Sequence, residues 1–210
     1  MLKINSMCPD FQCKTTEGDI SFHEWLGDSW GVLFSHPKDF TPVCTTELGS
    51  LGQMKAEFDA RNVKVIGLSV DGVEDHKKWL NDIKDVSGTM PDYPIIADED
   101  LKVAKLFNML EADAGTTSMG RTAVDNETVR TIFVVRPDKR IGLYLTYPMA
   151  TGRNFHEILR AIDSMFLSSS VSLPSTTIST SFCCFLETSL AIRSSRCKRP
   201  ETEFNLRLSD

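Results

Sequence analysis

Cys44 is the residue whose neighbours most clearly predict chemistry in this chain. It lies in the run SHPKDFTPVCTTE, residues 35–47. A thiol with a free pKa of about 8.5 is a poor nucleophile, so a reactive cysteine needs cationic neighbours or a helix N-terminus that ionises it. The apolar segment 30–35 predicts a buried strand, and apolar residues then recur at helical spacing at Leu48, Leu51, Met54 and Phe58. Cys44 is therefore expected in or just before a first helical turn, where unpaired N–H groups favour a thiolate.

An alternative is that Cys44 is a structural cysteine, because free cysteines are among the most buried residue types and are usually inert. The surrounding pattern favours a reactive thiol. Pro-x-x-x-Thr-x-x-Cys followed by Thr-Thr-Glu resembles the active-site signature of the peroxiredoxins. The Ser-His-Pro that precedes it and the Cys-Thr-Thr-Glu that closes it resemble the one-cysteine, peroxiredoxin 6-like branch of that family.

The resemblance extends from about residue 4 to about residue 167, with the expected elements in order. Strands that alternate with helices indicate an α/β sheet. The resemblance implies a thioredoxin-like fold, with a central mixed β-sheet flanked by helices. The chain predicts strands at 63–70, 128–135 and 140–147, a short apolar segment at 94–97 that leads into 100–110, helices at 74–85 and 154–167, and a turn at 136–139.

The residues around Cys44 predict how a peroxide would react. The thiolate attacks one peroxide oxygen, the other oxygen leaves as water or an alcohol, and the cysteine becomes a sulfenic acid. Hydrogen-bond donors aimed at both oxygens would stabilise the developing charge. The hydroxyl of Thr41, three residues before the sulfur, and the backbone N–H groups of Val43 and Cys44 are placed to supply them.

The resemblance assigns roles to five further residues. Arg130 matches the family's active-site arginine, and Arg153 matches a second arginine of the family pattern. Glu47 would hold an arginine in place, Pro37 would shield the thiolate from water, and His36 would lie near the sulfur. From spacing alone, the arginines could instead be surface residues paired with carboxylates, and the histidine could simply be hydrogen-bonded at a strand end.

The cysteine pattern predicts how the sulfenic acid is reduced. The six cysteines are Cys8, Cys13, Cys44, Cys183, Cys184 and Cys197. A two-cysteine enzyme would carry a Val-Cys-Pro segment beyond the last core helix, and none follows residue 167. We therefore expect a one-cysteine mechanism with an external thiol reductant such as glutathione or thioredoxin, and neither a cofactor nor a metal. Cys8 and Cys13 are interpreted as structural or surface thiols, while substitution by a tail cysteine stays open.

Composition restricts the location and the partners. The first residues lack the apolar region of a signal peptide, which predicts a cytoplasmic protein with reduced thiols. The net charge of −6 and the pI near 5.3 give no basic footprint for nucleic acid. No apolar run approaches the ~20 residues of a membrane span.

A second motif, Gly-x-Ser-x-Gly, occurs at residues 27–31. The nucleophile elbow of lipases needs its serine between a strand and a following helix, whereas Ser29 precedes a strand, so a plain turn is expected. The family resemblance nevertheless adds an alternative. Peroxiredoxin 6 proteins are described as having a calcium-independent phospholipase A2 activity assigned to a serine, a histidine and an aspartate, and His23, Ser29 and Asp138 match those positions.

The resemblance ends where the composition changes. Residues 1–167 form the predicted peroxiredoxin domain, and residues 168–210 form a Ser/Thr-rich tail that we expect to be largely disordered. Peroxiredoxin 6 proteins carry at this point a segment that packs near the active site and across the dimer, and this chain lacks a recognisable counterpart. Homodimerisation through the strand that ends near Tyr147, and full activity, are therefore in doubt. The alternative is a redox-responsive isoform that does not turn over.

Overall fold

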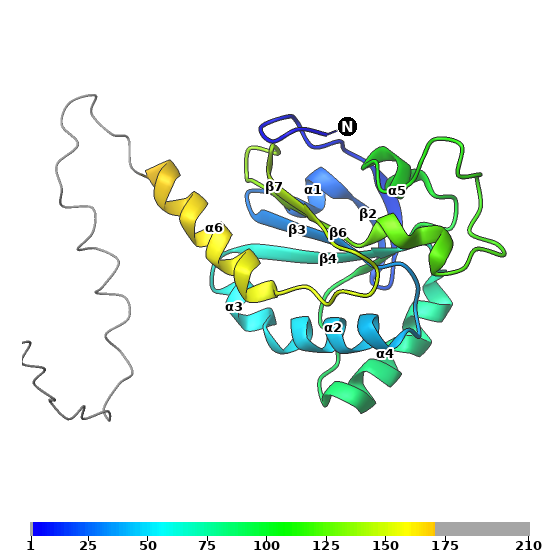
Figure 1. Cartoon of the computed structure of the whole chain (residues 1–210). Helices are drawn as coiled ribbons and strands as arrows, with labels where there is room; N and C mark the ends of the chain where they lie inside the picture. Colours follow the sequence, from blue (N-terminus) through cyan, green and yellow to red (C-terminus); the bar gives the residue numbers. More distant parts are fainter. Residues whose placement is uncertain (1, 171–210) are drawn as a thin grey trace, which may run out of the picture. The chain divides into compact units, whose positions relative to one another are not determined.

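One mixed β-sheet forms the centre of the protein in the computed structural model (Figure 1). The structure describes residues 2–170, and the side chains of residues 2–126 and 130–167. Strands β3, β4 and β5 are parallel, and the other neighbouring pairs are antiparallel. Across the described sheet the order is β2 (Gly18–Ser21), β1 (Gln12–Thr15), β5 (Ile95–Ala97), β4 (Val63–Ser69), β3 (Trp30–Ser35), β6 (Thr131–Val135) and β7 (Ile141–Thr146).

Helices cover both faces of this sheet (Figure 1). Along β3, Val32 and Phe34 belong to the core on one face, and Leu33 belongs to the core on the other, as the alternation of a strand requires. The first core is shared with α2 (Pro42–Gln53), α3 (Lys55–Asp59), α4 (Val73–Ser87) and α6 (Phe155–Ser170). The second is shared with α1 (Phe22–Leu26) and α5 (Lys102–Leu106). These three layers confirm the predicted α/β class.

Several predicted elements are confirmed closely. The strand at 30–35 is β3, and the strand at 63–70 is β4. Helix α4 covers the predicted 74–85, and it is followed by Gly88, whose φ of 75° is the left-handed conformation that glycine favours after a helix. The turn expected at Ser29 and the turn between β6 and β7 are both present.

One predicted strand begins later than expected. The strand predicted from residue 128 begins at Thr131, because the 3₁₀ helix η1 (Val124–Val129) precedes it. Tertiary contacts override the local β preference here: the buried side chains of Asn126 and Arg130 reach across to Pro37 and Glu47. The segment 100–110, for which the sequence predicted no element type, contains the short helix α5, and Asn108 with its positive φ of 56° follows it.

The ends of the domain add elements that the sequence did not reveal. The hairpin β1–β2 and the short helix α1 precede β3. Helix α6 continues to Ser170, three residues beyond the predicted end at 167, and the rest of the predicted disordered tail lies outside the described residues. In the described part of the chain, no helix has both the length and the apolar character that crossing a membrane requires.

Candidate active site

Cys44 is the third residue of α2, just after the loop that leaves β3. Pro42 is the first residue of the helix, a position where its missing N–H costs nothing. The remaining N–H groups of a first turn have no intrahelical partner and carry partial positive charge. The side chain of Cys44 therefore lies at the predicted end of the helix, and it is completely buried.

Arg130 contacts the sulfur directly. Its Nη2 donates to Sγ of Cys44 across 3.3 Å, and its Nη1 donates to Oε2 of Glu47. The arginine is only 1% exposed, and its Nε has no hydrogen-bond partner in the described part of the chain. A guanidinium has five N–H donors, so Arg130 keeps donors beyond the two that contact the sulfur and Glu47.

Glu47 holds Arg153 as well as Arg130. Its Oε1 accepts the backbone N–H and the Nε–H of Arg153 at 2.6 and 3.0 Å, and its Oε2 accepts Nη2–H at 3.0 Å. Burial lowers the pKa of Arg153, while the attraction of Glu47 opposes that effect. Since Glu47 lies three residues after Cys44, both project from neighbouring positions on α2. One carboxylate thus ties two buried guanidiniums to the helix that carries the sulfur.

The loop between β3 and α2 is fixed by its own polar contacts. The hydroxyl of Thr41 donates to the carbonyl oxygen of Lys38 at 3.1 Å. Pro37 is buried, and its carbonyl oxygen accepts a hydrogen bond from Nδ2 of Asn126 at 3.0 Å. Oδ1 of Asn126 in turn accepts Nε–H of Arg121 at 2.7 Å. The segment before β6 therefore holds the backbone of Pro37 in place.

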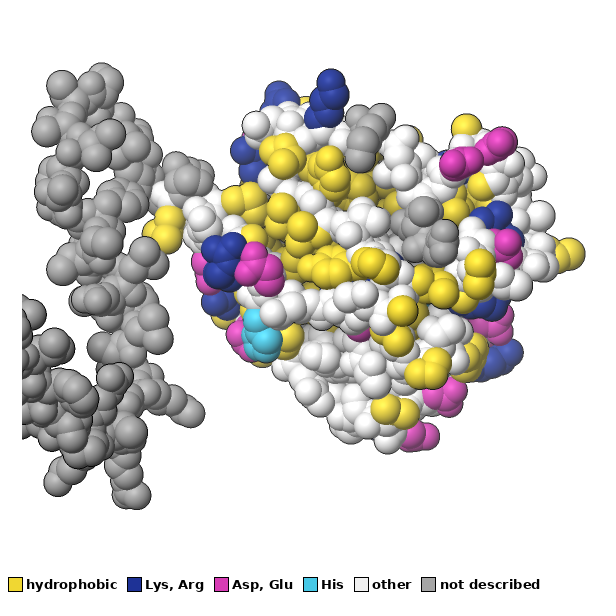
Figure 2. Space-filling view, in the orientation of Figure 1, with side chains coloured by type: hydrophobic (Ala, Val, Ile, Leu, Met, Phe, Trp, Pro, Cys, Tyr) yellow, Lys and Arg dark blue, Asp and Glu magenta, His cyan; other side chains and the backbone are white. Residues whose placement is uncertain are grey.

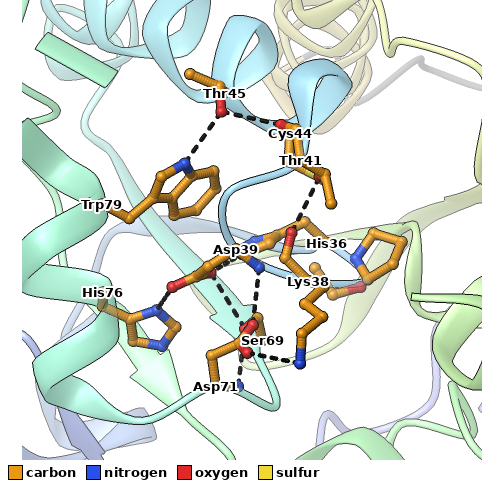
Figure 3. A network of polar contacts seen from close by, with 12 residues as sticks. His36, Lys38, Asp39, Thr41, Cys44, Thr45, Ser69, Asp71, His76 and Trp79 are labelled. Atoms are coloured by element: carbon orange, nitrogen blue, oxygen red, sulfur yellow. Dashed lines mark hydrogen bonds and ion pairs between the residues drawn. The ribbon is translucent and has the colours of Figure 1, made fainter. Parts of the chain in front are cut away.

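His36 belongs to a buried network centred on Asp39 (Figure 3). Nε2 of His36 is 2.6 Å from Oδ1 of Asp39, and Nδ1 of His76 is 2.6 Å from Oδ2. Ligand atoms of His36, Asp39 and Asp71 lie within 4.8 Å of one another, a spacing that a metal ion could use. However, Asp39 is hydrogen-bonded to two histidines, and Lys38 Nζ lies 3.5 Å from Asp71. Since these groups compensate the carboxylates, we assign no metal here.

Residues 4–143 match the AhpC/TSA family, over more than half of the chain. The chain belongs to this family, whose members are peroxiredoxins. The 1-Cys peroxiredoxin of Dictyostelium discoideum is 48% identical over 166 residues, which cover 79% of this chain and 65% of that protein. The mitochondrial peroxiredoxin PRX1 of Saccharomyces cerevisiae is 50% identical over 79% of this chain and 63% of its own. Peroxiredoxin-6 of Gallus gallus is 48% identical over 79% of this chain and 74% of its own.

Solved structures agree with this assignment. The yeast mitochondrial 1-Cys peroxiredoxin superimposes with a TM-score of 0.76 at 47% identity, covering 85% of this chain and 84% of that one. A cysteine-to-serine variant of the peroxiredoxin 6 of Arenicola marina gives a TM-score of 0.71 at 43% identity, covering 84% and 80%. The predicted thioredoxin-like fold and the resemblance to one-cysteine proteins are confirmed. The chain spans less than two thirds of the length of the Dictyostelium and yeast relatives.

The other described cysteines of this peroxiredoxin are poor nucleophiles. Burial, with a contribution from Asp10, raises the pKa of Cys8 to about 12. Burial, followed by the charges of Asp98 and Asp19, raises the pKa of Cys13 to about 12. Both residues therefore stay thiols at neutral pH. Cys183, Cys184 and Cys197 lie outside the described residues.

The structure does not join the three residues matched to a phospholipase site. The hydroxyl of Ser29 donates to Oδ1 of Asn62 at 2.9 Å, and Asp138 accepts hydrogen bonds from Arg136. Nε2 of His23 is buried and has no hydrogen-bond partner among the residues that the structure describes. Within the described ranges, no hydrogen bond connects the serine, the histidine and the aspartate, so the geometry adds no support to that alternative.

The sequence interpretation missed His76 and Asn126, which contact Asp39 and Pro37 in the loop between β3 and α2. The clearest signal was His76, which shares the buried face of α4 with Trp79 and Ile83. A polar residue on an apolar helical stripe needs a buried partner, and Asp39 is that partner. Asn126 gave no such signal, because its contact with Pro37 depends on the path of an irregular segment.

Proposed function

We propose that this peroxiredoxin is a thiol-dependent peroxidase that reduces hydrogen peroxide and organic hydroperoxides, including lipid hydroperoxides, in antioxidant defence and redox homeostasis. The observation that carries the proposal is the 3.3 Å contact between Nη2 of Arg130 and Sγ of Cys44 at the N-terminus of α2. A buried cation and a helix terminus at one sulfur favour the thiolate form.

In the proposed reaction, the thiolate of Cys44 attacks one oxygen of the hydroperoxide. The S–O bond forms as the O–O bond breaks, and the sulfur loses two electrons. The proton released by the thiol is transferred to the leaving oxygen, which departs as water or an alcohol. Cys44 becomes a sulfenic acid, and no prosthetic group is needed because the sulfur itself is oxidised.

The surrounding residues stabilise charge during this step. Arg130 and the first N–H groups of α2 donate to the peroxide oxygens. The sequence predicted that the hydroxyl of Thr41 donates to the peroxide, but this hydroxyl gives its proton to the carbonyl oxygen of Lys38. We therefore assign its oxygen as an acceptor for the O–H of the hydroperoxide. Glu47 orients both arginines, and Pro37 limits access of water to the sulfur.

An external thiol would supply the two electrons that restore Cys44. The raised pKa values of Cys8 and Cys13 argue against either as a resolving nucleophile. Glutathione and thioredoxin are the proposed reductants. The structural study of the yeast relative concerns thiol resolution through the glutathione and thioredoxin systems.

A homodimer through β7 and a cytoplasmic location are part of the same proposal. β7 is the terminal strand of the described sheet, so its outer edge is available to a second copy. In the view of Figure 2, apolar side chains gather over β7 and α6, where Leu143, Leu145 and Met165 are partly buried.

The net charge of the protein gives no basis for nucleic-acid binding. Because one relative is mitochondrial, a mitochondrial location is the outcome that would contradict the proposed cytoplasmic location.

The decisive experiment oxidises the full-length reduced protein with one equivalent of hydrogen peroxide in the presence of a sulfenic-acid trap. We expect the adduct on the peptide that contains Cys44, and no adduct in Cys44→Ser. Absence of labelling in folded protein would overturn the proposal. Peroxide consumption that stops after one equivalent despite excess thiol would favour the isoform that does not turn over.

A further inference from the structure

A buried line of hydrogen bonds runs through Asp39 beside the proposed active site. Nε2 of His76 lies 3.1 Å from the carbonyl oxygen of Ile96, and Nδ1 of His76 lies 2.6 Å from Oδ2 of Asp39. Oδ1 of Asp39 lies 2.6 Å from Nε2 of His36 (Figure 3). Both imidazole rings are 0% exposed. The line connects β5, α4 and the loop that leads to Cys44.

The partners in this line determine the protons of His76. A backbone carbonyl can only accept, so Nε2 of His76 carries a proton. Burial raises the pKa of Asp39, but the hydrogen bonds from His36 and His76 outweigh burial and lower it to about 2. The carboxylate is therefore ionised and also only accepts, so Nδ1 of His76 carries a second proton. His76 is an imidazolium.

The same carboxylate determines the tautomer of His36. Nε2 of His36 must donate to Asp39, so in the neutral ring the lone pair is on Nδ1. Nδ1 is buried and has no partner in the described part of the chain. The ring centroid lies 4.9 Å from that of Trp79, whose indole N–H donates to the hydroxyl of Thr45, the residue after Cys44. The ring of His36 therefore packs against a side chain that is hydrogen-bonded to the first turn of α2.

Nearby charges leave His76 as the counterion of Asp39. Asp71, which follows β4, accepts the backbone N–H of Asp39 and the hydroxyl of Ser69, each at 2.8 Å. Lys38 Nζ lies 3.5 Å from Asp71 and compensates it. Burial lowers the pKa of His76, but the hydrogen bond and charge of Asp39 outweigh that effect and raise it.

We propose that His76 is a positioning residue of the peroxidase site. It is a buried cation that orients the carboxylate of Asp39, and Asp39 in turn holds His36 with its proton on Nε2. The lone pair on Nδ1 of His36 is then ready to accept a hydrogen bond from the hydroperoxide. The inference rests on the proposed role of Cys44. Without His76, Asp39 would lose the donor that fixes its orientation. The carboxylate would then no longer hold His36 with its lone pair on Nδ1.

The protonation states are tested on the unmodified full-length protein by long-range ¹H–¹⁵N correlation spectra at neutral pH, with histidine signals assigned from single His→Gln variants. We expect both nitrogens of His76 to be protonated, and His36 to carry its proton on Nε2 only. A neutral His76, or a doubly protonated His36, would overturn the proposal. This measurement does not depend on whether Cys44 reacts, so it separates the inference from the proposed function.

The functional consequence is tested with His76→Asn, which keeps a short N–H donor toward Asp39 but has no charge. We expect the rate constant for oxidation of Cys44 by hydrogen peroxide to fall about tenfold, comparable to the loss when a partner that orients a metal-bound histidine is removed. The long-range ¹H–¹⁵N spectrum of this variant is expected to show that His36 no longer carries its proton on Nε2 alone. The exposed His156→Asn is the control and should behave as the parent.

An unchanged rate and an unchanged His36 tautomer in folded His76→Asn would overturn the positioning role. If that variant does not fold, the spectrum of the unmodified protein decides the inference. Failure of Cys44 to form a sulfenic acid in the unmodified protein would instead overturn the proposed function.

Discussion

The carboxylate of Glu47 receives three hydrogen bonds from Arg153, one from the backbone N–H and two from the guanidinium. The same carboxylate is paired with Arg130, whose other terminal nitrogen contacts Sγ of Cys44. Two guanidiniums share one carboxylate, so a net positive charge is buried beside the sulfur. This arrangement favours a negatively charged sulfur, and it makes Glu47 the residue on which both the stability and the geometry of the site depend.

Glu47→Gln should therefore destabilise the protein. The substitution keeps the shape of the side chain but leaves two buried guanidiniums without their counterion, and breaking a buried ion pair typically costs about 3–5 kcal/mol. Urea unfolding of parent and variant measures this difference. The exposed Glu24→Gln serves as the control and should stay within about 0.5 kcal/mol of the parent. A comparably small loss for Glu47→Gln would contradict the role of the carboxylate.

Arg130→Lys should lower the rate constant for oxidation of Cys44 by hydrogen peroxide about 10²–10³-fold, the usual loss when one donor that stabilises the transition state is removed. Lysine keeps the charge but lacks the planar fork that reaches the sulfur and Glu47 together. Stopped-flow measurement of the oxidation tests this expectation. Arg136→Lys, in the turn between β6 and β7, is the matched control. An unchanged rate in folded Arg130→Lys would remove Arg130 from the mechanism.

Local sequence patterns predicted the part of the site that depends on neighbouring residues. The buried strand β3, the prolines and the apolar period of α2 were enough to place Cys44 at a helix N-terminus. Glu47 meets Arg130 across 83 positions and Arg153 across 106 positions, and no local period encodes such pairs. Those partners were predicted only through the resemblance to a family.

The sequence patterns did not predict the backbone at Arg130 or the network around Asp39, because tertiary contacts determine both. Arg130 was placed inside a strand, but it precedes β6 and follows a 3₁₀ helix. Its contacts with Glu47 and Cys44, rather than β propensity, determine the backbone there. Asp39 and His76 lie 37 residues apart, and each resembles an ordinary polar residue until the fold buries them together. Buried polar networks of this kind need the whole fold before they can be recognised.

Asp39→Asn should destabilise the protein in a pH-dependent way. The pKa of Asp39 is lowered from 3.8 to about 2, so its contribution of roughly 2 kcal/mol is complete above pH 3.8 and is lost as the pH falls toward 2. The pKa of His76 is raised above 6.5, so its contribution is complete below pH 6.5 and is lost as the pH rises through the folded pKa.

The gap in unfolding free energy between the parent and Asp39→Asn should therefore be widest between pH 3.8 and 6.5 and should narrow on both sides. Urea unfolding at a series of pH values measures it, with the exposed Asp82→Asn as the control. A gap that stays constant across this series would mean that the two histidines and Asp39 are not coupled through their charges.

Gly49→Ala should loosen the packing of the helix that carries Cys44. A Cβ at Gly49 would lie 2.4 Å from Cβ of Ser87 at the end of α4, so α2 and α4 would have to separate. Overpacking of this kind costs about 1–3 kcal/mol. At Gly52, one helical turn later, an added Cβ would lie 3.4 Å or more from its neighbours, so Gly52→Ala is the matched control. Thermal unfolding should show a loss for Gly49→Ala in the parent. Ser87→Gly removes hydrogen bonds of its own, so it serves as the background in which Gly49→Ala should cause no further loss, because the clash is gone. A further loss in that background would point to the backbone of α2 rather than to its contact with α4.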